Sequence, residues 1–490
     1  MPEESRSEST YSVTPPAPAL ITARGLGIAI YVILAIALGL ITLFVKPLII
    51  TGILMVLFAG VMIALYPYFG LILYYLVIIV RPEILWTQIE ALRPPRLISA
   101  ALLLSVLIHR KYNRERFVVL KDRMSKHMGF FAATLFASVP LAYMQDNSFW
   151  FAIDFLWLFL YYVLLINILT TEFRIKGFIW LFMLAGGYNA ISSAIAYMSG
   201  TLVVAQGIER AEGLAGTDPN TLAVSILLAL PFLLFALKWI KNNFLKLIPL
   251  IFLIAGIFTI AITGSRSGVI GLVIVAFTVW LVTKKKMITA VVAILVLIGG
   301  WFALPPQYKQ RYATIFAEER DSSSEGRIDA WKAGWGMFKA NPVTGIGVDC
   351  FPYAYSSGQY SDTRALLRPH NMYIQIIAEL GILGLVAFGA LIWYIMRSNF
   401  RLRKQFKAAG MGDHAFVWVS YAITCSITAL FVTSVFGHSL FRAHWYVCAA
   451  LTLVMMSVGK DILAGTSGAS PKSELTPQFA KLLSLRPKNR

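Results

Sequence analysis

Charged residues are scarce in this sequence. They make up only 14% of its 490 residues, while hydrophobic residues make up 58%. Soluble domains carry about a quarter charged residues, so the composition excludes an ordinary soluble protein. It indicates instead a membrane protein that crosses the bilayer many times.

Cysteine is almost absent as well. The three cysteines, Cys350, Cys425 and Cys448, lie far apart in the chain. This spacing fits neither a disulfide framework nor a cysteine metal site, so we interpret them as small apolar residues. A nucleotide-binding glycine motif, an internal repeat and a coiled-coil pattern are also missing.

Long apolar segments fill most of the chain. A helix needs roughly 20 apolar residues to cross the hydrocarbon, where its backbone amides are satisfied within the segment. We therefore predict an all-α polytopic membrane protein with about 12–14 transmembrane helices and one long, partly helical outer loop. The fourteen candidate segments are 26–45, 48–65, 67–80, 95–108, 128–144, 149–169, 175–198, 220–237, 245–262, 268–283, 287–303, 371–396, 415–436 and 440–458.

Composition also suggests how the chain is organised. Residues 1–24 are polar and proline-rich, which predicts a disordered cytoplasmic tail without the features of a signal peptide. Transmembrane helices are expected over 25–303, a periplasmic loop over 304–370, and further transmembrane helices over 371–458. A basic cytoplasmic tail follows over 459–490.

Lysine and arginine gather in every second loop between the predicted helices, so all of these short basic loops lie on the same side of the membrane. Seven of them lie in 109–127, three in 284–286 and five in 397–407. Because short basic loops stay in the cytoplasm, these segments fix the orientation, and the net charge of +19 is mostly this signature. Nucleic acid is not expected as a partner, since stacking aromatics are not interleaved with the basic residues. Anionic membrane lipids are expected to bind these basic loops.

Three unusual segments fall on the other side, which is the periplasmic face. They are "GIERAEGLAGTDPNTLA" (207–223), "TGSRSG" (263–268) and the long loop 304–370, which ends in "RPHN". Each has an ordinary interpretation. In that interpretation "TDPN" starts a helix, with Thr217 or Asp218 as its cap. "TGSRSG" is then a tight turn, and His370 an interfacial histidine.

Arg327 is harder to explain as a surface residue. If 326–340 is a helix, Arg327 shares a face with Trp331, Trp335 and Phe338. A surface helix normally separates its charges from its aromatic side chains. If the aromatic stripe packs on the membrane domain, Arg327 lies at the outer membrane surface and needs an anionic partner.

Two acids, Asp154 and Glu379, fall inside predicted spans, where carboxylates are often functional. Glu379 follows His370 by nine residues, half a turn around a helix, so the two do not share one face. We interpret Glu379 as a structural hydrogen-bonding residue.

Arginines, a histidine and a glycine-rich turn at one membrane face suit phosphate chemistry. Arginine binds phosphate oxygens in pairs and keeps its charge. The glycines and Ser265 around Arg266 let backbone amides approach an anion, and a histidine takes a proton near neutral pH. Clustered carboxylates that would hold a metal are missing from this side, so no cofactor is expected. The set favours transfer from a lipid pyrophosphate, with arginines on the leaving group.

These residues resemble a known family. "GTDPNTLA", "TGSRSG", "GRIDAWKAGW" followed by "NPVTGIGVDCF", and "HNMYIQIIAELGILGLV" are similar to successive motifs of the bacterial O-antigen ligase and polymerase superfamily, over roughly 200–390. The resemblance implies an inner-membrane glycosyltransferase of lipopolysaccharide or polysaccharide biosynthesis. Such an enzyme is inverting and metal-independent. It moves a glycan from undecaprenyl pyrophosphate to lipid A-core or another acceptor at the periplasmic face.

The resemblance also assigns residues. Arg266 matches the arginine of the family's short outer turn, Arg327 its loop arginine, and His370 the histidine of a His-x10-Gly pattern closed by Gly381. The family's leucine after the loop arginine is here Trp331. His370, Arg266 and Arg327 are the candidate catalytic residues. The candidate substrate-binding residues are Arg266, Arg327, Arg210, Arg368 and Ser265.

Other functions remain open at this point. A polymerase shares the donor and the motifs of a ligase and differs only in its acceptor. A polysaccharide flippase would be equally hydrophobic, although repeated halves and ionisable groups at mid-membrane would be expected. We favour the ligase.

Overall fold

The computed structural model describes residues 47–80, 93–112, 117–205, 208–213, 217–313, 322–362 and 365–465. The predicted span 26–45, the tail 1–24 and most of the tail 459–490 lie outside these ranges. Residues 1–61 and 62–490 form two units. The described part of the first unit is residues 47–61, which belong to the apolar helix α2 (Pro47–Leu65). All further description concerns residues 62–490.

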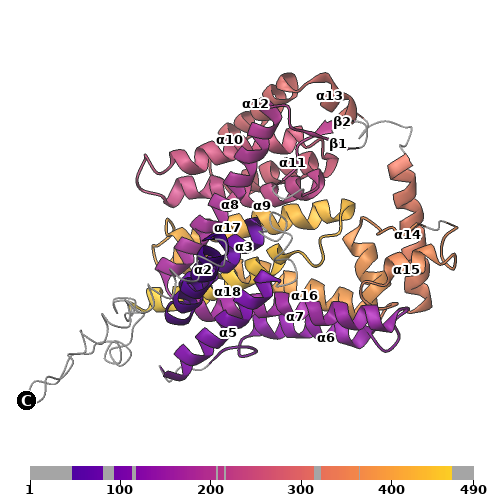
Figure 1. Ribbon diagram of the computed structural model, residues 1–490. Helices are drawn as coiled ribbons and strands as arrows, with labels where there is room; N and C mark the ends of the chain where they lie inside the picture. Colours follow the sequence, from indigo (N-terminus) through magenta and orange to yellow (C-terminus); the bar gives the residue numbers. More distant parts are fainter. Residues whose placement is uncertain are drawn as a thin grey trace, which may run out of the picture. The chain divides into compact units, whose positions relative to one another are not determined.

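Helices account for nearly all of the regular structure in the described residues (Figure 1). The only strands there, Val203–Ala205 (β1) and Ile208–Arg210 (β2), pair antiparallel. The helices are α2 (Pro47–Leu65), α3 (Pro67–Val80), α5 (Pro94–Tyr112), α6 (Arg123–Ser138), α7 (Gln145–Ile168), α8 (Glu172–Met198), α9 (Pro219–Trp239), α10 (Leu247–Ile262), α11 (Arg266–Val282), α12 (Lys286–Ala303), α13 (Pro306–Ala313), α14 (Ser322–Ala340), α15 (Phe351–Ser356), α16 (Met372–Ala408), α17 (Ala415–Thr433), the 3-10 turn η3 (Ser434–Phe436) and α18 (Ala443–Leu463).

The prediction of an all-α polytopic membrane protein is confirmed. Every predicted segment on described residues overlaps a helix, although α6 ends at Ser138, before the predicted end at 144, and α16 continues to Ala408. Six described helices are long and apolar enough to cross a membrane: α7, α8, α9, α16, α17 with η3, and α18. A seventh results if the bent pair Lys286–Phe302 and Pro306–Ala313 is one span. Several of the predicted spans are therefore shorter helices, among them α3, α10 and α11.

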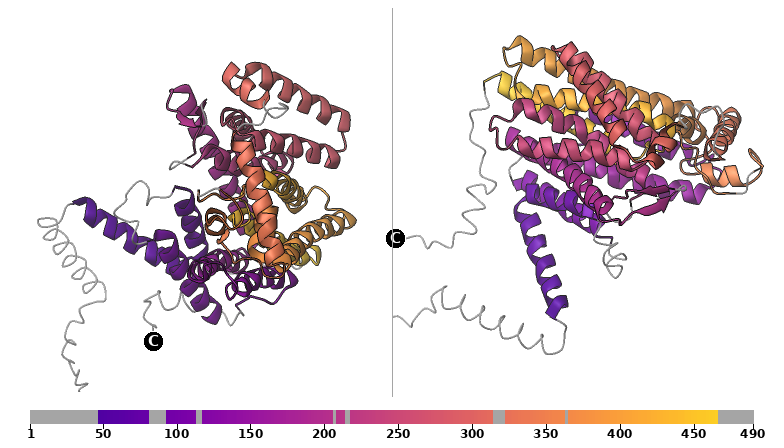
Figure 2. Two further views of the ribbon diagram at one scale, coloured as in Figure 1. Left: turned by 90° about the vertical axis from the view of Figure 1, so that its right-hand side faces the viewer. Right: turned by 90° about the horizontal axis from the view of Figure 1, so that it is seen from above.

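The starts of α9, α11, α16 and α18 lie together, and we call this the site end. Here α11 packs so closely on α9 that a Cβ on Gly268 would meet the Cβ of Ala223 at 3.0 Å. One turn further, a Cβ on Gly271 would meet Thr433 at the end of α17. Helix α14 runs across this region, as Figure 2 shows in orange. The segments that looked unusual in the sequence therefore share one end of the bundle.

The opposite end carries the basic loops. Arg110, in the last turn of α5, donates a hydrogen bond to the carbonyl of Asn167 at the end of α7. At the start of α17, His414 lies 3.3 Å from Glu172 at the start of α8. The two kinds of loop are thus at opposite ends, as the alternation of short basic loops predicted.

Helix α16 is broken at Gly381, which has φ 61° and ψ −157°. A break inside a membrane helix frees backbone groups that must find partners. The segment 342–347, which contains most of the "NPVTGIG" motif, supplies them. Four backbone hydrogen bonds join the segments: Ile346 N to Ala378 O (2.8 Å), Gly347 N to Glu379 O (3.1 Å), Ile382 N to Pro342 O (2.9 Å) and Leu383 N to Val343 O (3.2 Å). Two motifs far apart in sequence are therefore one structural unit.

We predict that Gly381→Ala destabilises the protein by about 1–3 kcal/mol or more, because the backbone region of Gly381 is essentially restricted to glycine. In addition, a Cβ there would lie 2.3 Å from the Val343 carbonyl oxygen. Thermal unfolding of the purified protein in detergent measures the effect.

Gly389, two turns further along α16, is the matched control, since a Cβ there meets nothing within 4 Å. Gly389→Ala should be neutral or stabilising by up to about 1 kcal/mol. Equal melting temperatures for the two variants would contradict the role given to the break.

Candidate functional site

The "TDPN" segment starts α9. The side chain of Asp218 accepts hydrogen bonds from the backbone N–H groups of Asn220 (3.0 Å) and Thr221 (3.1 Å), and Pro219 opens the helix. The interpretation as a helix start is confirmed, with Asp218 as the cap. The side chains of Asn220 and Thr221 contact arginines from two other parts of the chain.

Asn220 accepts a hydrogen bond from Arg210 at 2.9 Å. The Arg210 guanidinium also donates to the carbonyl of Thr263 at 2.6 Å. Its side chain is buried, which lowers the pKa of Arg210 to about 10, so it remains charged at neutral pH. Arg311 donates to the neighbouring carbonyl of Gly264 at 2.7 Å. Arg210 and Arg311 thus both stabilise the backbone of the "TGSRSG" turn.

The "TGSRSG" turn joins α10 to α11. Ser265 caps α11 by accepting a hydrogen bond from the Gly268 N–H at 3.3 Å, and its hydroxyl lies 3.1 Å from that of Ser267. Arg266 is the first residue of α11. Helix starts carry a partial positive charge and favour anions. The turn therefore places Arg266 at a helix start, where the partial positive charge of the backbone adds to the charge of the guanidinium group.

Each residue of the "RPHN" segment has a separate contact. Arg368 pairs with Asp349 at 2.8 Å. Asn371 caps α16 through its side chain. The carbonyl of Pro369 accepts a hydrogen bond from the Trp331 indole at 2.8 Å. His370, between them, has φ 48°, a left-handed conformation that is uncommon for residues other than glycine. The neighbouring contacts thus hold His370 in a strained position, which is typical of functional sites.

The surroundings of His370 keep its imidazole uncharged. Burial lowers its pKa below the usual 6.5, Arg327 and Arg368 lower it further, and Asp218 opposes them. Arg327, Arg368 and Asp218 therefore act on the ring electrostatically. An uncharged imidazole at neutral pH can accept a proton.

Sequence reasoning missed His438. Its ring contacts that of His370, with the centroids 4.1 Å apart. Arg442, four residues later, donates to the hydroxyl of Thr221 at 3.0 Å. The available signal was the concentration of His438, Arg442 and His444 around the predicted outer end of the last span.

The packing face of α14 differs from the expected one. The side chains of Ala330, Ala333 and Met337 are buried, whereas Trp335 is 50% exposed, so the aromatic stripe is not the packed face. The reason is close approach: a Cβ on Gly334 would lie 2.3 Å from Ile374 of α16, and only small residues fit beside it. Trp331 still turns toward the "RPHN" segment, one helical turn after Arg327.

The two acids inside spans have structural partners. Glu379 is buried beside the break in α16 and accepts a hydrogen bond from Gln375 at 3.1 Å. This contact supports our interpretation of Glu379. Asp154 on α7 pairs with Arg96 on α5 at 2.8 Å.

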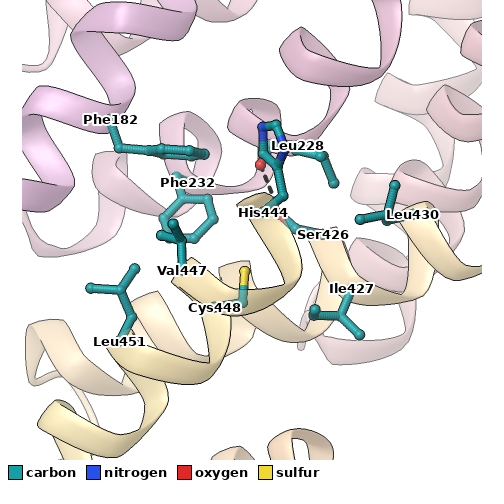
Figure 3. A pocket seen from close by; sticks show the side chains of 10 residues that line it. All are labelled: Phe182, Leu228, Phe232, Ser426, Ile427, Leu430, His444, Val447, Cys448 and Leu451. Atoms are coloured by element: carbon teal, nitrogen blue, oxygen red, sulfur yellow. Dashed lines mark hydrogen bonds between the residues drawn. The ribbon is translucent and has the colours of Figure 1, made fainter. Parts of the chain in front are cut away.

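A small cavity lies between α8, α9, α17 and α18 (Figure 3). It is lined by Phe182, Leu228, Phe232, Ser426, Ile427, Leu430, His444, Val447, Cys448 and Leu451. The Ser426 hydroxyl donates a hydrogen bond to the carbonyl of Leu228 at 2.9 Å. This largely apolar lining suits hydrocarbon better than a charged group, so the polar chemistry belongs to the site end.

The sequence model of the family described as O-antigen ligase matches residues 250–389. The match runs from α10 into α16 and includes Arg266, Arg327 and His370. This part of the chain is thus similar to the O-antigen ligase family. It is also similar to the teichuronic acid biosynthesis protein TuaE of Bacillus subtilis (strain 168), with 26% identity over 261 residues. That alignment covers 49% of this chain and 52% of the relative, so the chain spans about half the length of this relative.

Trp331→Phe should loosen the "RPHN" segment. The substitution removes the indole N–H and keeps an aromatic ring, and losing one hydrogen bond costs about 0.5–1.5 kcal/mol. We expect amide hydrogen exchange in a peptide covering 366–374 to become about 2- to 10-fold faster.

Trp335→Phe on the half-exposed side of the same helix is the control and should leave that peptide unchanged. Unchanged exchange in Trp331→Phe would show that the indole does not hold the segment.

Proposed function

We propose that the site end is the active site of a glycosyltransferase that takes a glycan from undecaprenyl pyrophosphate. The match of residues 250–389 to the O-antigen ligase family supports a role in this type of glycan transfer. The observation that carries the proposal is the imidazole of His370 at one end of a membrane bundle, where burial and Arg327 lower its pKa. A proton acceptor beside fixed positive charge suits a reaction that expels a diphosphate.

In this proposal the diphosphate of the donor binds between Arg266 and Arg327. Arg266 contributes from the start of α11 and Arg327 from α14. Arg210 and Arg368 stabilise the surroundings of the diphosphate, because Arg210 is hydrogen-bonded to the Thr263 carbonyl and Arg368 forms an ion pair with Asp349. Ser265 holds the turn in place by capping α11.

The reaction is a single in-line displacement. The hydroxyl oxygen of the acceptor attacks the anomeric carbon of the glycan as His370 accepts the hydroxyl proton. The bond between that carbon and the diphosphate oxygen breaks with its electron pair, which leaves undecaprenyl diphosphate with the arginines. The configuration at the anomeric carbon is inverted.

We favour a ligase that uses lipid A-core or another glycan acceptor, at the periplasmic face of the inner membrane. A polymerase would use a second lipid-linked glycan instead. Mass spectrometry of glycans from a deletion strain separates the two, since unligated polymer accumulates without a ligase and single repeat units accumulate without a polymerase.

His370→Ala should lower the single-turnover rate by about 10²–10⁴-fold with little change in donor affinity. The wild-type rate should be constant above pH 7 and fall only below the usual histidine pKa of 6.5. The sign follows because burial and Arg327 lower the pKa of His370, so the reactive uncharged form persists to lower pH. The assay uses protein in nanodiscs with an undecaprenyl-pyrophosphate-linked glycan.

A cationic His370 that only holds the diphosphate would give the opposite result, namely weaker donor binding in the variant and no loss of wild-type rate on acidification. A wild-type rate in His370→Ala would remove both roles.

The proposed orientation predicts different labelling at the two ends. A cysteine at Gln359, an exposed residue after α15, should react with an impermeant thiol reagent in intact spheroplasts. A cysteine at Lys285, exposed between α11 and α12, should react only after the membrane is opened. The three native cysteines are buried and give little background. The reverse pattern would contradict the orientation.

A further inference from the structure

His438 lies in the loop between η3 and α18, outside the matched residues 250–389. Its ring is tilted by 41° against that of His370, with 4.1 Å between the centroids. Contact at this distance means that each ring limits the rotation of the other and excludes water from the face between them.

The loop that carries His438 is fixed on two sides. The indole of Trp445 donates to the Ser439 carbonyl at 2.8 Å, and the Tyr446 hydroxyl donates to the Leu440 carbonyl at 2.9 Å, which ties the loop to α18. The Ser439 hydroxyl contacts the sulfur of Met372 at 3.4 Å, at the start of α16. The loop is therefore anchored to the helix that His370 precedes.

Positive charge faces His438 from several elements. Burial, His370, Arg368 and Arg442 lower its pKa to about 3, while Asp218 acts in the opposite direction. His438 is therefore uncharged at neutral pH. Its Nδ1 atom is buried without a hydrogen-bond partner among the described residues. Burying such an atom costs free energy, so a purely structural position would be better filled by an apolar ring.

We propose that His438 is a positioning residue for His370: its uncharged ring fixes the plane of the His370 ring and keeps water away from it. This inference rests on the proposed function, in which His370 accepts the proton of the acceptor hydroxyl. When His370 gains that proton, a charged neighbour would oppose the new cation, whereas the uncharged His438 ring does not.

The first test measures His370 directly and does not depend on glycan transfer. Diethyl pyrocarbonate acylates only the unprotonated imidazole, and mass spectrometry locates the product on His370. In the wild type the pH midpoint of this reaction should lie below about 6.5. In His438→Ala it should rise toward about 6.5, because water reaches the ring. In His438→Phe it should stay low, because an aromatic ring still covers His370.

The second test is the single-turnover rate of the same variants in nanodiscs. We expect His438→Ala to lose about 10-fold or more through misorientation of His370, with donor affinity unchanged. His438→Phe should retain most of the rate. His414→Ala, at the opposite end of the bundle, is the control and should change neither quantity.

An unchanged midpoint and rate in His438→Ala would overturn the inference. So would a loss of rate in His438→Phe as large as in the alanine variant, because His438 would then act through its nitrogen atoms. If His370→Ala keeps the wild-type rate, the proposed function fails, whereas the midpoint shift in His438→Ala still tests the positioning of the ring.

Discussion

The first turn of α9 is the contact on which the arrangement of the site depends. Asp218 satisfies the helix start through the Asn220 and Thr221 amides, which leaves both of those side chains pointing outward to other elements. Asn220 then receives Arg210 from β2, and Thr221 receives Arg442 from the start of α18. One turn of helix thus connects the glycine-rich turn before α11 with the loop of the paired histidines. The Asp218 carboxylate also acts on His370 and His438, where it partly opposes the lowering of their pKa values by the surrounding arginines.

The break in α16 provides the second constraint. Because the segment 342–347 completes the hydrogen bonds around Gly381, the loop that follows it has a fixed position beside the start of α16. Asp349 in that loop pairs with Arg368, and Trp331 of α14 holds Pro369. Two contacts within the segment between α12 and α16 therefore position His370: Asp349 holds Arg368, and Trp331 holds Pro369. A strained φ angle at His370 persists because these contacts leave it no alternative.

Much of the fold follows from hydropathy, because a membrane helix must be both apolar and long. Segments such as 149–169 and 175–198 therefore match α7 and α8 closely. The convergence of the unusual segments at one end of the bundle could also be predicted. The alternation of short basic loops is enough to assign the remaining loops to the other side of the membrane. The packed face of α14 could not be found this way, because periodicity cannot show that Gly334 permits close approach. His438 belongs to no motif, and its importance comes from a contact with His370, 68 residues away in sequence.

A structure of the protein in nanodiscs with bound undecaprenyl diphosphate, the product of the proposed reaction, tests the central claim most directly. The account predicts diphosphate density at the site end, with phosphate oxygens within hydrogen-bonding distance of the Arg266 and Arg327 guanidinium groups. The His370 ring should face the position from which the acceptor hydroxyl attacks, in line with the departing diphosphate oxygen. Density at the opposite end, or at the site end without contact to either arginine, would contradict it.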